Sequence, residues 1–194
     1  MREARPISDS VTAFTFSNDI GDVLIDRDRL QERVRELGAA ISQDYDGRVP
    51  LLVGVLRGTI LFFADLLRAI NVHVEIDYIA ISSYGPSTHS SGVVRVLKDL
   101  DESIEGRDVI LVEDIVDTGL TLRYILRNLR NRRPASLAIC ALLDKQVRRL
   151  VDIDIKYKGF EIPDAFVVGY GLDYRQRYRN LPFICILKPE VYQS

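Results

Sequence analysis

The sequence of 194 residues predicts an α/β fold, in which a mostly parallel, twisted sheet is flanked by helices. Two observations lead to this prediction. Short uninterrupted apolar runs, such as those at 51–56 and 109–112, are typical of strands that are buried on both faces. These runs alternate with segments of helical periodicity through the first two thirds of the chain, as βαβ units require.

The individual elements follow from local patterns along the chain. Apolar residues recur at helical spacing from Asp26 to Tyr45, which predicts an amphipathic helix that ends near Gly47. Thr59 precedes a second helical segment at 60–70, and alternating β-branched residues predict a strand at 72–82. The other expected elements are a helix at 120–131 and strands at 93–97, 108–112, 136–143, 166–170 and 183–187.

Composition excludes several classes of protein. Hydrophobic residues make up 47% of the chain, which is enough to offset the entropy of ordering it and excludes extensive disorder. The formal net charge is −2, so we expect no nucleic-acid partner, because binding a phosphate backbone requires a basic excess. Cys140 and Cys185 lie in apolar runs and are interpreted as reduced core residues of a cytoplasmic protein.

The same arithmetic bounds the organisation of the chain. We expect a single domain over 1–194, because this length is typical of one domain and no linker divides it. The N-terminal residues include acids and a proline, which is unlike a signal peptide. No apolar run approaches the roughly 20 residues that span a bilayer, so we expect no membrane partner.

The most informative segment is an acidic run at the end of a predicted strand. The apolar residues at 109–112 lead to three carboxylates, Glu113, Asp114 and Asp117. Small residues then open the helix at 120–131, where unpaired backbone N–H groups can hold a phosphate. Capping explains one such acid, but three within five positions exceed what capping requires. Carboxylates beside a phosphate cradle suit a ligand that also carries hydroxyls and a divalent cation.

The segment VILVEDIVDTGLT resembles the phosphoribosyl-pyrophosphate signature of type I phosphoribosyltransferases, and specifically that of hypoxanthine-guanine phosphoribosyltransferases. Further matches occur in the order expected for that family, so the resemblance covers about residues 50–187. These matches are Leu56-Arg57-Gly58, Ser83-Tyr84-Gly85, Lys145, Phe166-Val-Val-Gly-Tyr170, and Asp173 with Arg179.

The resemblance implies a fold and a reaction. The fold would be a type I phosphoribosyltransferase core over about 26–143, with a small hood over the base site. N-terminal residues and the segment of about 145–194 would form that hood. The reaction would be purine salvage, in which hypoxanthine or guanine displaces pyrophosphate from phosphoribosyl pyrophosphate, with magnesium as cofactor. The products would be IMP or GMP and pyrophosphate.

The resemblance also assigns the acidic run. Glu113 and Asp114 match the residues that hold the ribose and magnesium, and Asp117 matches the general base that receives the proton from the purine. The 5′-phosphate would bind to backbone amides and hydroxyls of the turn. That phosphate-binding set is Asp117, Thr118, Gly119, Leu120 and Thr121.

A second group of residues is implied to contact pyrophosphate. Leu56, Arg57 and Gly58 match a loop in which the peptide bond before the basic residue is cis. Arg179 matches a cation on the departing pyrophosphate, a task that suits the forked guanidinium group. Ser83 and Tyr84 match a lid that closes over the reacting groups and excludes water.

Base recognition is implied for a third group. Lys145 matches the lysine that donates a hydrogen bond to O6 of a 6-oxopurine. Its ammonium can only donate, so it selects an oxo group over the exocyclic amine of adenine. Phe166 matches the ring that stacks on the purine, and Val167 supplies backbone contacts to its edge. Asp173 matches both a base-side residue and a second magnesium ligand.

Members of this family form homodimers or homotetramers, so the resemblance also implies a homo-oligomer. Two other interpretations stay open at this point. The first is a pyrimidine regulatory protein with uracil phosphoribosyltransferase activity that binds RNA. The second is a nucleotide-sensing module without catalytic activity. The acidic pair and Asp117 disfavour the first, while Lys145, Phe166 and Asp173 would be dispensable in the second.

Overall fold

The computed structural model describes residues 14, 16–83 and 94–193. Two short 3-10 helices, η1 (Ser17–Asp19) and η2 (Gln146–Arg148), accompany the longer elements. The strands and α-helices are, in chain order, β1 (Ile20–Ile25), α2 (Arg27–Asp44), β2 (Leu51–Leu56), α3 (Ile60–Ala69), β3 (Glu75–Ser83), β4 (Val94–Lys98), β5 (Asp108–Val116), α4 (Leu120–Asn131), β6 (Ser136–Asp144), β7 (Tyr157–Glu161), β8 (Val167–Val168), β9 (Ile184–Leu187) and α5 (Pro189–Tyr192).

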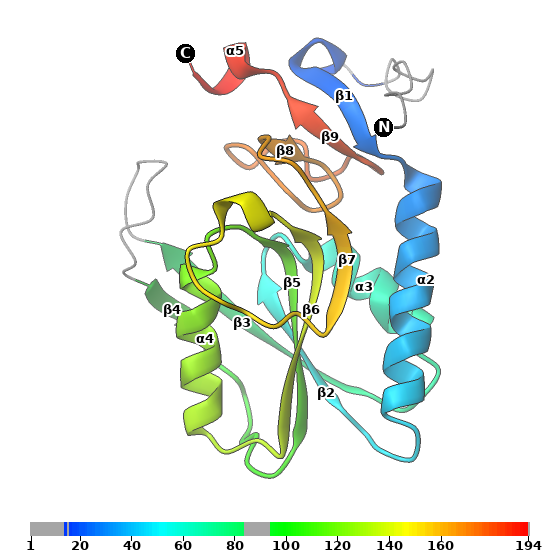
Figure 1. The fold of residues 1–194 in the computed structure, drawn as a ribbon, viewed down its shortest axis with the longest axis vertical. Helices are drawn as coiled ribbons and strands as arrows, with labels where there is room; N and C mark the ends of the chain where they lie inside the picture. Colours follow the sequence, from blue (N-terminus) through cyan, green and yellow to red (C-terminus); the bar gives the residue numbers. More distant parts are fainter. Residues whose placement is uncertain (1–13, 15, 84–93, 194) are drawn as a thin grey trace.

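A six-stranded sheet in the order β4-β3-β2-β5-β6-β7 forms the centre of the molecule (Figure 1). All neighbouring strands are parallel except β4, which pairs antiparallel with β3 at one edge. The expected mostly parallel sheet with flanking helices is therefore confirmed. In this arrangement the carboxyl ends of β2, β5 and β6 meet at one edge, where ligands bind in α/β folds.

Helices cover both faces of this sheet because its strands are apolar on both sides. Along β5, Ile110 and Val112 pack in one core cluster with the buried residues of α2 and α3. The alternate residues Val109 and Leu111 pack in a second cluster with the apolar face of α4. Figure 1 shows α2 and α3 together on one side of the sheet and α4 on the other.

A second sheet of three strands, in the order β1-β9-β8, forms a small layer above the carboxyl ends of the central strands (Figure 1). It has its own apolar cluster, which includes Ile20, Phe183 and Cys185. The layer combines an N-terminal strand with C-terminal segments. One expected boundary is wrong, however, because β7 lies after residue 145 and yet pairs parallel with β6 in the central sheet.

Helix α4 has the bounds expected from the sequence, 120–131. Helix α2 begins after the N-cap residue Asp26, whose carboxylate accepts a hydrogen bond from the Arg29 N–H at 2.9 Å. The strand expected at 108–112 extends to Val116, so Glu113 and Asp114 lie inside β5 and not beyond it. The strand expected at 166–170 contains only two strand residues, because the chain turns at Gly169 with φ +101°. Strands β1 and β7 were not expected.

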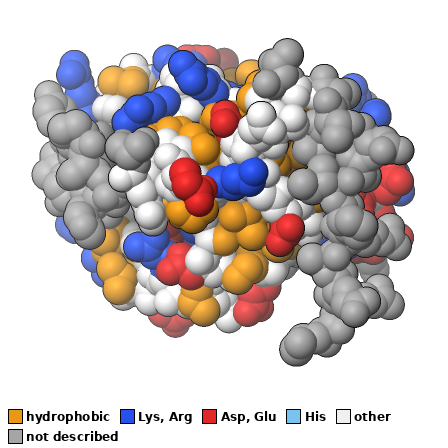
Figure 2. All heavy atoms as spheres, turned by 90° about the horizontal axis from the view of Figure 1, so that it is seen from above, with side chains coloured by type: hydrophobic (Ala, Val, Ile, Leu, Met, Phe, Trp, Pro, Cys, Tyr) orange, Lys and Arg blue, Asp and Glu red, His pale blue; other side chains and the backbone are white. Residues whose placement is uncertain are grey.

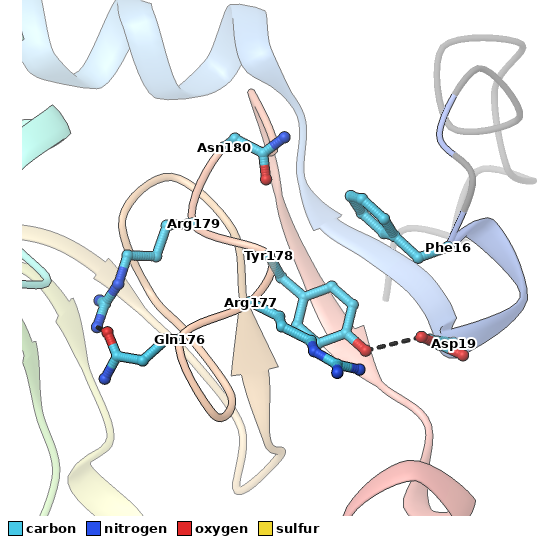
Figure 3. A pocket seen from close by; sticks show the side chains of 7 residues that line it. All are labelled: Phe16, Asp19, Gln176, Arg177, Tyr178, Arg179 and Asn180. Atoms are coloured by element: carbon cyan, nitrogen blue, oxygen red, sulfur yellow. Dashed lines mark hydrogen bonds between the residues drawn. The ribbon is translucent and has the colours of Figure 1, made fainter.

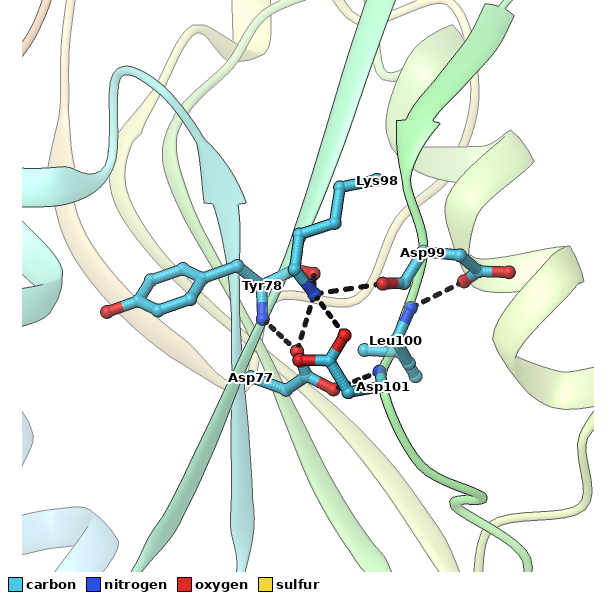
Figure 4. Close-up of polar contacts among 6 residues, drawn as sticks. All are labelled: Asp77, Tyr78, Lys98, Asp99, Leu100 and Asp101. Carbon is cyan, nitrogen blue, oxygen red and sulfur yellow. Dashed lines mark hydrogen bonds and ion pairs between the residues drawn. The ribbon is translucent and has the colours of Figure 1, made fainter.

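Strands β3 and β4 are also joined by a cluster of charged residues around Asp77 and Lys98 (Figure 4). Lys98 Nζ donates to the Asp77 carboxylate at 3.0 Å and to the Tyr78 carbonyl at 3.1 Å. The Asp101 N–H donates to the other Asp77 oxygen at 2.8 Å. Burial opposes ionisation of Asp77, but these donors, together with the Tyr78 N–H, lower the pKa of its carboxyl group. The cluster fixes β4 on β3.

None of the helices in the described part of the chain is long and apolar enough to cross a membrane. Both cysteines are free and buried.

Candidate active site

The turn from β5 to α4 lies at the carboxyl edge of the central sheet. Gly119 is the N-cap of α4 and has φ +81°, a left-handed conformation that other residues adopt at a cost. A Cβ atom there would lie 2.7 Å from Ile153 Cδ1 and 2.8 Å from Val151 Cγ2. The conformation therefore favours glycine, and a larger residue would also displace the side chains of Ile153 and Val151.

One cavity of about 320 Å³ gathers most of the residues expected on the phosphate and ribose side. It is lined by Val55, Leu56, Gly58, Ile81, Glu113, Asp114, Ile115, Val116, Asp117, Thr118, Gly119, Thr121 and Leu122. Leu120, Arg57 and Arg179 do not line it. A single concave site therefore joins the acidic run, the first turn of α4 and the end of β2.

Glu113 and Asp114 are adjacent, and Glu113 is 7% exposed. Burial, and then the charge of Asp114, raises the pKa of Glu113 well above its ordinary value. Burial also raises the pKa of Asp114 to about 6, although the Ile115 N–H and the Arg179 guanidinium act in the opposite direction. A cation bound beside them would stabilise both ionised forms.

Asp117 follows β5 directly. Its Oδ1 atom is shielded from solvent and has no hydrogen-bond donor among the described residues. The Nε atom of Arg148 lies 3.7 Å from that oxygen, a contact that the sequence did not indicate. An acceptor without a donor is suited to receive a hydrogen bond from a ligand.

The end of β2 approaches this acidic run closely. The Leu56–Arg57 peptide bond is cis, as the family resemblance implies. A Cβ atom on Gly58 would lie 1.6 Å from Asp114 Oδ2, so only glycine fits beside this carboxylate. From the other side, a Cβ atom on Gly171 would lie 2.0 Å from the Gly58 carbonyl oxygen. The loop after β2 is thus enclosed between the acidic run and the segment after β8.

That segment carries Asp173 and Arg179 as an ion pair. Arg179 Nη2 lies 2.7 Å from Asp173 Oδ1, and Arg179 Nη1 donates to the Gly171 carbonyl at 2.6 Å. The charges of both residues act on Asp114: Arg179 lowers the pKa of this carboxyl group and Asp173 raises it. The structure therefore brings these two predicted residues to the acidic run, although neither lines its cavity.

The expected base-side residues come from two different layers. Lys145 follows β6, is 6% exposed, and its Nζ lies 3.9 Å from Asp164 Oδ1. Phe166 precedes β8, and its ring stacks on Tyr192 of α5 with centroids 4.9 Å apart. Val167 is buried in β8, opposite Ile186 of β9. None of the four expected base-side residues, Asp173 included, lines the 320 Å³ cavity.

A buried ion cluster lies behind Lys145. The Asp144 carboxylate accepts from Arg149 Nη2, and Lys158 Nζ lies 3.1 Å from its other oxygen. Backbone N–H groups of Lys145 and Leu150 donate to the carbonyls of Val116 and Thr118 at 2.9 and 3.0 Å. The turn that carries Lys145 is therefore attached to the β5–α4 turn. The sequence motif alone gave no indication of Asp144 in this role.

Only one of the two expected lid residues belongs to the part of the chain that the structure describes. Ser83 is the last residue of β3, and Tyr84 lies outside the described residues.

The carboxylates of Glu113 and Asp114 fit the way in which proteins usually bind magnesium. The described residues contain no group of three or more side chains that would enclose a metal by themselves. Magnesium commonly binds through one or two carboxylates and completes its shell with water and substrate phosphates. The adjacent residues Glu113, which is buried, and Asp114, which is partly exposed, provide such carboxylates beside the turn.

A second cavity, of about 560 Å³, lies between η1 and the loop at 176–180 (Figure 3). Its lining residues are Phe16, Asp19, Gln176, Arg177, Tyr178, Arg179 and Asn180. The Tyr178 hydroxyl donates to Asp19 Oδ2 at 2.7 Å and so joins this loop to the N-terminal segment. In Figure 3 the side chains of Gln176 and Arg179 lie together on the opposite side of the loop from Tyr178.

Comparisons with known proteins agree with this geometry. The model of the phosphoribosyl transferase domain matches residues 26–175. The chain is 52% identical over 179 residues to a hypoxanthine-guanine phosphoribosyltransferase of Bacillus subtilis, and the match covers 92% of this chain and 99% of that protein. The corresponding enzyme of Mycobacterium avium is 50% identical over 198 residues, with 97% and 98% covered.

Solved structures show the same relationship. A hypoxanthine phosphoribosyltransferase from Staphylococcus aureus superposes with a TM-score of 0.89 at 48% identity, covering 93% of this chain and 98% of that one. A hypoxanthine-guanine phosphoribosyltransferase from Bacillus anthracis gives a TM-score of 0.83 at 47% identity, covering 87% and 99%. The chain therefore belongs to the phosphoribosyltransferase family, in the branch formed by the hypoxanthine-guanine enzymes.

Proposed function

We propose that this protein is a purine salvage enzyme, which transfers the 5-phosphoribosyl group of phosphoribosyl pyrophosphate to N9 of hypoxanthine or guanine. The observation that supports this most directly is the single cavity at the β5–α4 turn. It combines the adjacent carboxylates of Glu113 and Asp114, an Asp117 oxygen that accepts no hydrogen bond from the described residues, and the N-terminus of a helix. This combination suits a ligand that carries a phosphate and vicinal hydroxyls.

Displacement at the anomeric carbon passes through an oxocarbenium-like state, so the ribose must be held while the leaving group departs. Backbone N–H groups at the start of α4 hold the 5′-phosphate, with the hydroxyls of Thr118 and Thr121 beside them. Glu113 and Asp114 hold the ribose hydroxyls. Asp117 accepts the N7 proton of the base as N9 forms its bond to C1.

The leaving pyrophosphate is bound by Arg57, Arg179 and the backbone at Gly58. Magnesium would be held by Glu113 and Asp114, with water and pyrophosphate oxygens completing its shell, and the ion would supply positive charge against the pyrophosphate. Asp173, the third carboxylate that the resemblance assigns to magnesium, pairs with Arg179 and forms no three-carboxylate group with the other two among the described residues. Ser83 and Tyr84, which the resemblance assigns to a lid, would exclude water from the reacting carbon.

The base is selected at its oxo group. Lys145 donates to O6, and its burial leaves the ammonium with little competing water. The Phe166 ring stacks on the purine, and Val167 offers backbone groups to its edge. Adenine presents an amine where these enzymes require an acceptor, so the ammonium of Lys145 would face another donor.

We further propose that the protein is a cytoplasmic homo-oligomer, either a dimer or a tetramer. The edge strand β4 and its neighbour β3 carry large apolar side chains that are exposed in one chain: Ile76 at 49%, Val96 at 38% and Leu97 at 61%. Burial against a second copy would remove this surface from water. The two free, buried cysteines are typical of a reducing compartment.

A base-competition assay tests the proposed reaction. The purified protein is incubated with magnesium, phosphoribosyl pyrophosphate and hypoxanthine, guanine, xanthine, adenine or uracil in turn, and nucleotide formation is measured. We expect turnover of hypoxanthine or guanine and little of adenine. Turnover of uracil alone would favour the pyrimidine regulator, and nucleotide binding without turnover of any base would favour the sensing module.

A further inference from the structure

The Gln176 side chain joins the two arginines of the proposed pyrophosphate subsite. Its Oε1 atom accepts from Arg57 Nη1 at 3.3 Å and from Arg179 Nη2 at 3.1 Å. Guanidinium groups can only donate, so the carboxamide must turn its oxygen toward both of them. Arg57 lies 119 positions before Gln176 in the sequence, at the end of β2, so the contact joins the central sheet to the upper layer.

Gln176 is itself held in place by the residues around it. Its backbone N–H donates to Asp173 Oδ2 at 2.8 Å, and its φ is +66°. Asp173 also pairs with Arg179 at 2.7 Å. These three residues are thus joined to one another, and the position of the Gln176 carboxamide depends on the Asp173–Arg179 pair. Figure 3 shows the side chains of Gln176 and Arg179 close together.

The chemical nature of the bridge matters for a site that binds an anion. Two guanidinium groups near each other repel, and an acceptor between them reduces that repulsion. A carboxylate would do so by pairing with the arginines, and it would then compete with the phosphate oxygens. A carboxamide holds the same geometry and adds no net charge.

We propose that Gln176 is a positioning residue, which orients Arg57 and Arg179 for pyrophosphate without adding negative charge beyond that of Asp173, which already pairs with Arg179. This inference rests on the proposed function, in which both arginines contact the pyrophosphate group. It concerns binding of phosphoribosyl pyrophosphate and release of pyrophosphate, and it leaves binding of the base unaffected.

Two substitutions separate geometry from charge. For Gln176→Ala, we expect KM for phosphoribosyl pyrophosphate and the inhibition constant of pyrophosphate to rise roughly fivefold to tenfold, the size of one or two lost hydrogen bonds. For Gln176→Glu, we expect a larger rise, because a carboxylate neutralises the arginines. KM for hypoxanthine should change less than twofold in both variants.

Matched controls come from Gln43, which is exposed on α2. Gln43→Ala and Gln43→Glu make the same chemical changes away from the site and should leave every kinetic constant unchanged. Thermal melting of all four variants reports on folding. A lower melting temperature of the Gln176 variants with unchanged KM for phosphoribosyl pyrophosphate would indicate a purely structural role and would overturn the inference.

Arg179→Ala separates failure of this inference from failure of the proposed subsite. If Arg179→Ala raises KM for phosphoribosyl pyrophosphate while both Gln176 variants behave like the wild type, the subsite is right and the role of Gln176 is wrong. If Arg179→Ala changes neither constant, the assignment of the arginines to pyrophosphate is wrong and the inference fails with it. A Gln176→Glu variant that binds more tightly than Gln176→Ala would also contradict the argument from charge.

Discussion

The two halves of the site are built in different ways. The β5–α4 half takes its groups from one short run of sequence, residues 113–121, which the parallel sheet and the start of α4 hold through backbone hydrogen bonds. The upper half, at 170–179, contains no long strand and is held by backbone hydrogen bonds within its turns together with hydrogen bonds that involve side chains. Four of its residues other than glycine have positive φ: Tyr170, Arg175, Gln176 and Tyr178.

This difference separates two kinds of sensitivity. In the β5–α4 half, backbone groups bind the ligand, so most side chains of the turn can be substituted without loss of function. A residue that supplies a unique chemical group or a buried charge cannot be substituted in this way. Where several side-chain contacts share the task, the loss of any one is partial. The upper half should therefore lose function in small steps, and the β5–α4 half in large ones.

The largest effect is expected for Asp117→Asn. The amide cannot accept the base proton in the same way, so we expect kcat to fall by about 10²–10⁴-fold, the range of general-base catalysis. Binding of phosphoribosyl pyrophosphate should be retained, because backbone amides hold its phosphate. Single-turnover kinetics and titration calorimetry measure the two quantities, with Asp152→Asn, an exposed acid, as control. Lost binding with an unchanged chemical step would contradict the assigned role.

The next effect concerns the support behind the β5–α4 half. Asp144→Ala would leave Arg149, whose side chain is 15% exposed, without its carboxylate partner, and the Arg149 Nε atom is already without an acceptor among the described residues. Breaking a buried ion pair in this way costs about 3–5 kcal/mol. Urea denaturation measures the free energy of unfolding, and Asp46→Ala on an exposed turn is the control. A loss below about 1 kcal/mol would show that the cluster adds little.

The contrast between the two halves also explains what the sequence could predict. The β5–α4 half was predictable because strand, acids, glycine and helix are contiguous, so local rules of periodicity and capping identify them. The same rules predicted a strand that is too short. They ended it at Val112, because the next residues are acidic. Pairing with β6 carries β5 on to Val116, and tertiary contacts thus override the local polarity.

The upper half was less accessible to sequence reasoning because its contacts join distant residues. Strand β1 has polar residues within it and pairs with β9 near the other end of the chain, so neither strand predicts its partner. Gln176 looks like any exposed polar residue until Arg57 is placed beside it. Asp173 and Arg179 were found only through the family resemblance, which carries such long-range information indirectly.

A third prediction tests how tightly the two halves are fitted together. In Gly171→Ala, the new Cβ would lie 2.0 Å from the Gly58 carbonyl oxygen and would also suffer from a φ of +101°. Gly47→Ala is a matched control, with φ +71° and no atom within 4 Å of the new Cβ. We expect Gly47→Ala to cost about 1 kcal/mol of stability and Gly171→Ala about 1–3 kcal/mol more.

Activity should follow the same order, since the overlap would displace the loop at Arg57. KM for phosphoribosyl pyrophosphate is expected to rise roughly tenfold in Gly171→Ala and to be unchanged in Gly47→Ala, measured alongside urea denaturation of both. Equal behaviour of the two variants would mean that the upper half moves aside freely, and that the close packing of Gly171 on Gly58 does not matter.

The smallest effect is a loss of stability at alkaline pH, which arises within the upper half. Burial, and then the hydrogen bond to Asp19, raises the pKa of Tyr178 to about 12 from its ordinary value near 10. Among its other neighbours, Arg177 opposes this shift and Tyr174 adds to it. Because the folded state favours the neutral phenol, the stabilisation is complete below pH about 10 and is lost as pH rises toward 12.

At pH 11 these two pKa values correspond to a loss of about 1 kcal/mol relative to pH 9. The free energy of unfolding, measured by urea denaturation at both pH values, should therefore fall more in the wild type than in Tyr178→Phe, which has no phenol to ionise. Equal pH dependence in the two proteins would show that the contact between Tyr178 and Asp19 does not hold the loop. In that case, the chain of side-chain contacts that positions Arg179 would have to begin at Gln176 and Asp173 alone.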